Sequence, residues 1–322
     1  MMRTLLAALC GAILLAAMPV VAEDEGLDVG YVATGPIFDL PAGVSVEQME
    51  VHIALYSVHL AYVFKATTSQ TVHLSFALPE MPVNANPDIA ALDTNSRAAG
   101  LAADTQPANY LRLSVRVNGQ NLALGGRGRA LLDGMDVTRQ LLDAGVPLLA
   151  GPAEEPIWQN LPPAVQTTLE ARGLLDGDTA LWTYQANFAW DQAFEPGETR
   201  VEISYAPVFE YQGEARSVAD KASAATQAYC IDDALRRASA LIPAADLYTV
   251  THLNAPAGRW RGPVGQYRLV VDKQAVADLV AFCPLAAKKI APTTFEWTAK
   301  NFTLGSQTSV LYASAPDAAA EQ

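Results

Sequence analysis

Apolar and polar residues alternate over several long stretches of the chain, which predicts a mainly β protein. The alternation runs through Val58–Phe64 and again through Val72–Leu78, and the polar segment Ala66–Gln70 separates the two stretches. A period of two places the apolar side chains on one face of a strand. We therefore predict two antiparallel strands that a short loop joins.

A further hairpin is predicted where Asn118-Gly119 follows the alternating stretch Leu111–Val117. Both turn residues tolerate the positive φ of a type I′ turn, which suits antiparallel strands. Other alternating stretches predict strands at residues 182–190, 200–205, 247–253, 266–272, 294–299 and 308–313. A turn that contains Glu195–Glu198 joins the first two of these.

Helices are predicted to be few and short. Two of them end at a glycine, which readily adopts the left-handed conformation after a helix. The third begins at a pair of aspartates, which cap helix N-termini. The three ranges are 137–144, 163–172 and 234–241. We interpret the polar, alanine-rich residues 211–228 as a linker or helical bridge.

These elements predict an antiparallel β-sandwich with short helices over residues 23–215. We expect a smaller β region that carries one helix over residues 216–313, and a frayed tail over residues 314–322. Apolar residues make up 51% of the 322 positions, which is enough for a packed core and excludes a disordered chain.

The first 22 residues have the pattern of a secretory signal peptide. Arg3 precedes a long apolar run, and small residues stand before an acidic segment, so we predict cleavage between Ala22 and Glu23. No later run approaches the roughly 20 apolar residues of a membrane-spanning helix. The mature protein is therefore expected in the periplasm or outside the cell, without a transmembrane segment.

Removal of the signal peptide leaves two of the three cysteines, Cys230 and Cys283. A pair of cysteines in an oxidising compartment predicts a disulfide. By the chain-entropy model, such a bridge would stabilise the fold by about 4 kcal/mol. The alternatives are a reactive thiol or a metal site. The sequence has no CxxC motif and no histidine pair near these cysteines, which argues against both.

The charge of the chain argues against nucleic acid as a partner. It has 34 acidic and 21 basic side chains, for a formal charge of −13. Binding to a phosphate backbone needs clustered cations that displace counterions. Anionic lipid is a poor partner for the same reason.

No metal or cofactor site is predicted. If Ala66–Gln70 joins its two strands in simple register, His59 faces Ala77 and His73 faces Val63, too far apart for zinc ligands. The histidines at these positions are therefore interpreted as solvated strand residues. The glycine-rich run Gly125–Arg129 lacks the form of a phosphate-binding loop, and we interpret it as a strand end or turn.

The strongest candidates for a ligand site are Asp232 and Asp233, which stand beside Cys230, with His252 as a partner. Two neighbouring carboxylates can have different pKa values and so divide acid and base roles. Helix capping is the simpler explanation for them. Trp260 and Arg261 are either ligand-facing residues or part of an ordinary turn.

Several strings in this sequence together resemble the bacterial exported family known as domain of unknown function 4424. The resemblance follows the order of the strings over nearly all of the mature chain. They are Val58–Phe64, Phe76–Pro79, Leu132–Thr138, Gly145–Leu148, Phe188–Phe194, Tyr229–Asp233, Trp260–Pro263, Arg268–Lys273, Phe282-Cys283 and Lys288–Ile290. The resemblance implies an exported, mainly β protein and matches the two family cysteines to Cys230 and Cys283. It implies no catalytic residue.

Together these features predict a non-catalytic binding or scaffolding module of the bacterial envelope. Its partner would be an unidentified protein or small-molecule ligand there. The alternative is a hydrolase-like enzyme or a solute-binding protein. That alternative places a site between the two regions, near Asp232, Asp233, His252 and Trp260.

Overall fold

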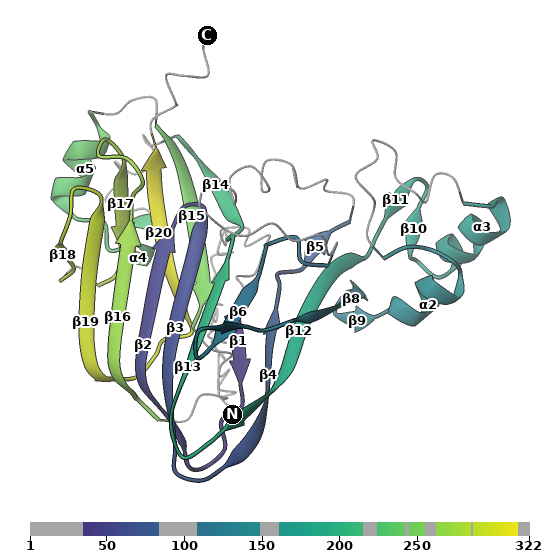
Figure 1. Cartoon of the computed structure of the whole chain (residues 1–322). Helices are drawn as coiled ribbons and strands as arrows, with labels where there is room; N and C mark the ends of the chain where they lie inside the picture. Colours follow the sequence, from purple (N-terminus) through teal and green to yellow (C-terminus); the bar gives the residue numbers. More distant parts are fainter. Residues whose placement is uncertain are drawn as a thin grey trace, which may run out of the picture. The chain divides into compact units, whose positions relative to one another are not determined.

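The computed structural model describes residues 35–83, 108–148, 161–214, 224–241, 245–254, 262–284 and 286–314. Within these ranges the protein is mainly β, as predicted, with several antiparallel sheets and four short helices (Figure 1). No helix in the described ranges is long and apolar enough to cross a membrane. The predicted cleavage site at Ala22 and Glu23, and the candidates Trp260 and Arg261, lie outside the described residues.

The largest sheet has eight strands in the order β18-β19-β16-β2-β3-β13-β6-β7. All neighbours in it are antiparallel except β16 and β2, which run parallel. Its strands are β2 (Val44–Ala54), β3 (Ser57–Ala66), β6 (Ser114–Val117), β7 (Gln120–Asn121), β13 (Gly197–Tyr205), β16 (Val264–Asp272), β18 (Lys288–Lys289) and β19 (Thr294–Phe302).

Two smaller sheets have six and four strands. The six-stranded sheet has the order β1-β4-β12-β8-β9, with β5 paired to β12. Its strands are β1 (Gly35–Phe38), β4 (Gln70–Ala77), β5 (Met81–Pro82), β8 (Gly125–Leu132), β9 (Met135–Asp136) and β12 (Thr183–Phe194). The four-stranded sheet has the order β14-β15-β20-β17, and its strands are β14 (Phe209–Glu214), β15 (Asp246–Leu253), β17 (Leu279–Phe282) and β20 (Gln307–Ser314). A separate short pair consists of β10 (Leu175–Asp176) and β11 (Thr179–Ala180).

The predicted pairing of the first two alternating stretches is wrong, although both are strands. β3 pairs with β2 and β13, whereas β4 pairs with β1 and β12 in a different sheet. The loop after Ala66 therefore carries the chain from one sheet to another. The register predicted for the histidines is wrong as well, because His59 lies opposite His52 and Ser204, and His73 lies opposite Asp191.

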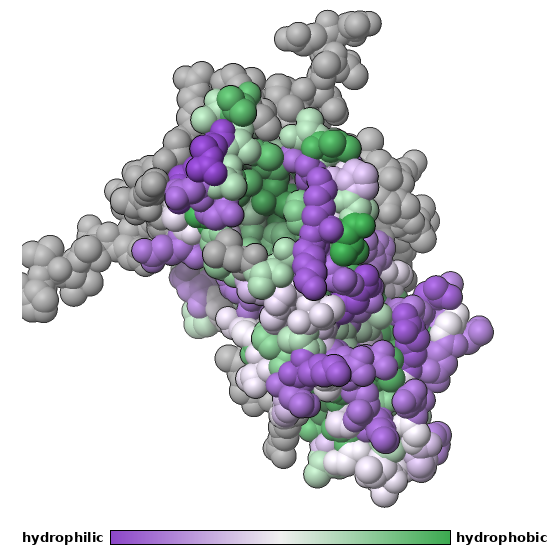
Figure 2. All heavy atoms as spheres, turned by 90° about the vertical axis from the view of Figure 1, so that its left-hand side faces the viewer, coloured by the Kyte–Doolittle hydropathy of each residue, from purple (hydrophilic) through white to green (hydrophobic). Residues whose placement is uncertain are grey.

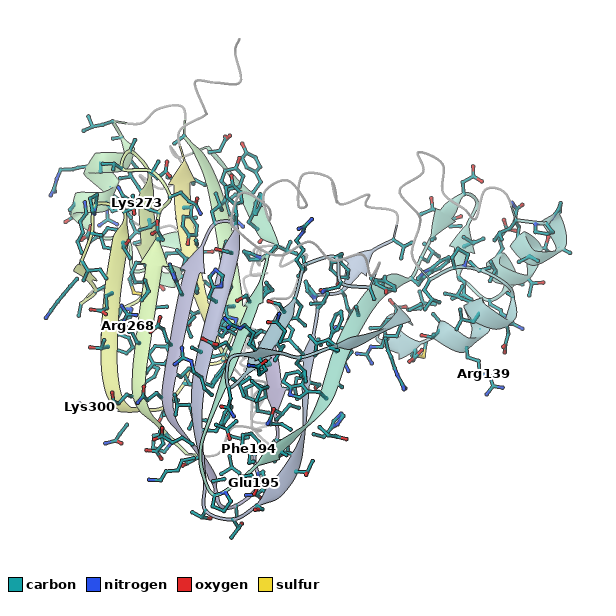
Figure 3. All side chains as sticks on the ribbon, in the orientation of Figure 1. Arg139, Phe194, Glu195, Arg268, Lys273 and Lys300 are labelled. Atoms are coloured by element: carbon teal, nitrogen blue, oxygen red, sulfur yellow. A yellow bond between two sulfur atoms is a disulfide. The ribbon has the colours of Figure 1, made fainter. Side chains whose placement is uncertain are left out.

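The turn at Glu195 makes the same crossing, because β12 and β13 also belong to different sheets. The two crossings lie against each other. Gly197 is opposite Ala66 on one side of the bend, and Phe194 is opposite Gln70 on the other. The Ser69 hydroxyl in one crossing donates a hydrogen bond of 2.5 Å to the Glu195 carboxylate in the other. A pair of strands thus bends as one unit, at the end of the molecule where Figure 3 labels Phe194 and Glu195.

The predicted turn and helices are confirmed. Asn118 and Gly119 have φ of 48° and 81° between β6 and β7. The helices are α2 (Thr138–Asp143), α3 (Pro163–Ala171), α4 (Ala224–Ala228) and α5 (Asp233–Ser239). The residues interpreted as a linker or helical bridge, 211–228, begin in β14 and end with the whole of α4. The helix agrees with a helical bridge, whereas the strand was not predicted.

The glycine-rich run forms β8, which lies beside aromatic residues of β12. A Cβ on Gly126 would lie 2.6 Å from the ring of Phe188, so this position needs glycine to let the ring lie over the strand. The run therefore serves packing, in agreement with its interpretation as a strand rather than a phosphate loop.

One large core lies under the eight-stranded sheet and is shared with both smaller sheets. The rings of Phe76 and Tyr205 meet across it at 5.2 Å, and the Tyr312 hydroxyl donates to the Ile53 carbonyl at 3.2 Å. A second, smaller core lies on the other side of the four-stranded sheet, where Tyr229 and Ile231 cover it. The four-stranded sheet takes β14 from the first region predicted from the sequence and its other three strands from the second. β16 of the second region also hydrogen-bonds to β2 across the predicted boundary.

Candidate functional site

The aspartate pair at the start of α5 acts as a helix cap. The Asp232 carboxylate accepts a hydrogen bond from the backbone N–H of Leu235 at 2.7 Å, and Asp233 forms an ion pair with Arg236 at 2.6 Å. Aspartate at this position satisfies a backbone donor that the helix leaves without an intrahelical partner. The capping alternative from the sequence therefore describes the geometry.

His252 does not join these aspartates. It lies on β15 and is fully buried, and its Nδ1 is 2.8 Å from the Tyr205 hydroxyl on β13. Alternation along β15 turns Val250 and His252 toward the large core, whereas Leu247 faces the small core beneath the helices. Asp232 is exposed beside α5, so the two residues do not share a cavity.

The predicted disulfide between Cys230 and Cys283 is present, with 5.3 Å between the two Cα atoms. Cys230 precedes the N-cap of α5, and Cys283 directly follows β17. The bridge therefore ties the segment that contains α4 and α5 to the edge strand of the four-stranded sheet.

A hollow of about 380 Å³ lies beside this bridge, and we call it the α5 hollow. Its lining is mostly apolar and comes from α5 and the residues before it, the segment between β16 and β17, β17, the segment before β18, and β19. The lining residues are Cys230, Asp232, Ala234, Leu235, Ala238, Lys273, Asp278, Leu279, Val280, Ala281, Phe282, Pro284, Ala287 and Phe295. Figure 2 shows hydrophobic residues gathered in a depression on this side of the molecule, with hydrophilic side chains around them.

The α5 hollow exists because three layers of the fold meet there without closing. β17 is the edge strand of its sheet, with α5 against one of its faces and the β18–β19 edge of the large sheet near the other. Leu235, Val280 and Phe295 are each only half-buried. Apolar surface thus stays open to solvent where these three layers meet.

Two charged residues, Lys273 and Asp278, are buried in the wall of the α5 hollow. Lys273 follows β16 and is 6% exposed, and its ammonium donates to the carbonyls of Val276 at 2.5 Å and Asp278 at 2.6 Å. Figure 3 shows it at the same end of the large sheet as α5. Burial lowers the pKa of Lys273, the nearby ammonium of Lys289 lowers it further, and Asp278 raises it. The ammonium of Lys289 lies 6.0 Å from the ring centroid of Phe295, which lines the same hollow.

The open face of the eight-stranded sheet carries a second candidate, which we call the polar face. Two hollows of about 450 and 270 Å³ adjoin there and share Glu50, Ala61 and Arg200 in their linings. A row across the strands reads Arg268, Glu50, Ala61, Glu202, Arg116, each residue opposite the next. The small Ala61 in the middle leaves room between two carboxylates.

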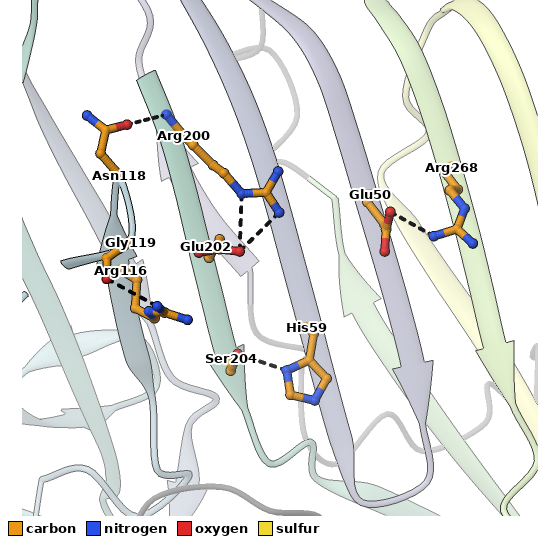
Figure 4. A network of polar contacts seen from close by, with 9 residues as sticks. All are labelled: Glu50, His59, Arg116, Asn118, Gly119, Arg200, Glu202, Ser204 and Arg268. Carbon is orange, nitrogen blue, oxygen red and sulfur yellow. Dashed lines mark hydrogen bonds and ion pairs between the residues drawn. The ribbon is translucent and has the colours of Figure 1, made fainter. Parts of the chain in front are cut away.

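The charges of the polar face pair with one another (Figure 4). Arg268 contacts Glu50 at 2.8 Å and Glu296 at 2.6 Å, and these two hydrogen bonds raise its pKa. Arg200 contacts Glu202 at 3.0 Å. Arg268 and Arg200 therefore already have carboxylate partners, whereas Arg116 donates to the Gly119 carbonyl at 3.1 Å.

Two histidines lie next to this row. His52 and His59 face each other on β2 and β3, with ring centroids 6.1 Å apart, and His59 Nδ1 is 2.8 Å from the Ser204 hydroxyl. Burial lowers the pKa of both, and His52 further lowers that of His59. Both histidines are half-buried, whereas the sequence predicted a solvated His59. Among the described residues, no group of three or more His, Cys, Asp or Glu side chains could hold a metal ion.

Comparison with protein families decides the relationship of this chain. A family described as domain of unknown function DUF4424 matches residues 22–311. The chain belongs to that family. No curated protein matches it. Among solved structures, it is similar to a Legionella pneumophila protein provisionally described as nutrient-binding. That similarity has 11% sequence identity and a TM-score of 0.40, and it covers 87% of this chain and 72% of the other.

Proposed function

We propose that this DUF4424 protein is exported to the periplasm or beyond and acts as a non-catalytic binding protein. We further propose that its ligand site is the α5 hollow. The observation that carries this proposal is an open cavity of about 380 Å³ whose walls are half-buried apolar side chains. That volume falls in the range of small-molecule pockets, roughly 300–1,000 Å³.

Physical chemistry favours an occupant for such a surface. Each square ångström of apolar surface removed from water contributes about 25 cal/mol. A ligand that covers Leu235, Val280 and Phe295 would gain this free energy, and the disulfide holds α5 and β17 in place beforehand. A prearranged wall lowers the ordering cost of binding.

The enzymatic alternative has less support from the geometry. It requires His252 to act together with Asp232 or Asp233. His252 is instead hydrogen-bonded to Tyr205 in the core, and Asp232 is engaged by the backbone of α5. The purified protein is therefore expected to show no turnover on generic ester, peptide, glycoside or phosphate substrates. Clear activity that Asp233→Asn abolishes would contradict this.

Filling the hollow tests the proposed site directly. Ala238 lines it from α5, so Ala238→Trp is expected to abolish binding of an uncharged dye such as N-phenyl-1-naphthylamine, followed by fluorescence. Ala240→Trp is the matched control, because Ala240 is exposed at the end of the same helix and does not line the hollow. Equal dye binding by both variants, or none by the wild type, would overturn the proposed site.

Export has its own experiment. The full-length chain, produced in a bacterial host with a periplasm, is expected in the periplasmic or extracellular fraction. Its intact mass should be that of a chain that begins at Glu23. A cytoplasmic protein that keeps residues 1–22 would contradict the export proposal. Dye binding would still test the α5 hollow as a ligand site, because it does not depend on export.

A further inference from the structure

The ammonium of Lys273 has more hydrogen-bonding capacity than its two contacts use. An ammonium has three N–H donors, and those of Lys273 reach two backbone carbonyls, of Val276 and Asp278. The residue lines the α5 hollow while being 94% buried, since its exposed fraction is 6%. One donor on a nearly desolvated cation is therefore left for a group inside the hollow.

Lys289 brings a second ammonium to the same wall. It lies opposite Phe295 in the β18–β19 pair, and its Nζ is 6.0 Å from the centroid of that ring, which lines the hollow. Its neighbour Lys288 lies opposite Glu296, whose carboxylate belongs to the polar face. Because side chains alternate along a strand, the two lysines serve different surfaces.

Lys273 and Lys289 place two positive charges at one wall of a cavity whose lining also includes the carboxylates of Asp232 and Asp278. Bringing like charges together in a partly desolvated site is unfavourable, and the proximity of Lys289 does lower the pKa of Lys273. Asp278 offsets part of this, and Asp232 stands on the opposite wall as the cap of α5. An incoming negative charge beside Lys273 and Lys289 would relieve the remaining repulsion.

We infer that the α5 hollow binds a carboxylate attached to an apolar body, with the carboxylate beside Lys273 and Lys289 and the apolar body against Leu235, Val280 and Phe295. The inference rests on the proposed function and names its ligand class. A fatty acid and the C-terminal residue of an apolar peptide share this chemistry.

Ligands of matched length test the inference. Displacement of N-phenyl-1-naphthylamine from the wild-type protein would be measured with octanoate, 1-octanol and octylamine. Octanoate is expected to bind about tenfold or more tightly than octanol, because it adds a charge-assisted hydrogen bond, and octylamine is expected to bind most weakly. An apolar tripeptide with a free or an amidated C-terminus distinguishes the two sources of the carboxylate.

The two lysines of β18 provide a matched pair of variants. Lys289→Met is expected to weaken octanoate binding about two- to fivefold and to leave octanol unchanged, since the lost ammonium is exposed. Lys288→Met should change neither. Lys273→Met should remove the preference for octanoate entirely, but it also breaks two bonds within its own loop, so Lys289→Met remains decisive if that variant does not fold.

The outcomes separate this inference from the proposed function. Equal affinity for octanoate and octanol, or equal octanoate binding by Lys288→Met and Lys289→Met, would overturn the carboxylate assignment while the hollow remains a binding site. Failure of the dye and of every ligand to bind would overturn both. Stronger binding of the free-acid peptide than of its amide would support the same chemistry with a peptide as its source.

Discussion

The polar face and the α5 hollow of this protein arrange their charges in opposite ways. On the polar face, Arg268 lies between two carboxylates and Arg200 is bound to Glu202. In the α5 hollow, Lys273 binds only backbone carbonyls in the contacts that its side chain makes, and Lys289 brings a like charge toward it. On the polar face two arginines are thus held by carboxylates. In the α5 hollow two ammonium groups interact beside open apolar side chains, and the lining also carries the carboxylates of Asp232 and Asp278.

The difference follows from where each surface lies in the fold. The polar face is the solvent side of a regular sheet, where the period of two puts Glu50 opposite Ala61 and Glu202 opposite Arg116 without further adjustment. The α5 hollow lies at the edge of a sheet, where a helix, a loop and the edge of another sheet meet. The regular strand register places charged side chains of the polar face opposite one another. No such register governs the side chains of the α5 hollow.

Removal of the disulfide should have the largest effect and should act on one of the two surfaces. The variant Cys230→Ser with Cys283→Ser is expected to lose about 4 kcal/mol of unfolding free energy, because the bridge closes a loop with a sequence separation of 53. It should also lose dye binding, since α5 is no longer tied to β17. Urea unfolding and dye fluorescence measure the two effects.

Reduced wild-type protein is the control for this variant and should behave in the same way. If the variant keeps wild-type stability and dye affinity, the α5 hollow does not depend on the bridge. Mass spectrometry of unreduced peptides would independently establish the link in exported protein.

Acidification should affect the polar face next. The pKa values of His52 and His59 are lowered in the folded protein, so below pH of about 6.5 the unfolded chain binds more protons than the folded chain. Stability should therefore fall as the pH falls through the interval from that value to the folded pKa values. The slope is at most about 1.4 kcal/mol per pH unit for each histidine.

The charged groups around the histidines set the test. Glu50 and Asp272 raise the pKa of His52, and Arg268 lowers it, but burial is the largest cause. In the double variant His52→Gln with His59→Gln, the urea midpoints of unfolding at pH 7.5 and pH 5.5 should differ less than they do in the wild type. An unchanged slope in the double variant would place the acid sensitivity elsewhere.

The sequence predicts many of the long strands because alternation is a local signal, but it misses β14 and β17 and does not predict which strands pair. β3 and β4 have a short polar segment between them, which is typical of a hairpin, yet the segment turns a corner between sheets. What decides the outcome is the second crossing at Glu195, about 130 residues away, which lies against the first. No local pattern contains that contact, so even correctly placed strands give the wrong register for His59 and His73.

The candidate site shows the same limit. Capping by Asp232 and the pairing of Cys230 with Cys283 could be predicted from the sequence, because the first follows from residue type before a helix and the second from the number of cysteines. Val280 and Phe295 look like core residues in the sequence, and only the meeting of three layers leaves them half open. A signal for the lysines did exist, since four of the six, Lys273, Lys288, Lys289 and Lys300, lie within the last 50 residues.

The smallest effect is expected from the ion pairs of the polar face, and it measures how strongly the paired charges there interact. Arg268 and Glu50 have side chains that are 40% and 44% exposed, so solvent screens their attraction. A double-mutant cycle with Arg268→Met and Glu50→Gln should give a coupling of about 0.2–1 kcal/mol in urea unfolding. The pair Arg139 and Asp143 on α2, at 93% and 72% exposure, should give less. A coupling above about 2 kcal/mol would show that the polar face stores electrostatic energy, which would make it, rather than the α5 hollow, the surface where an incoming charge has the larger effect.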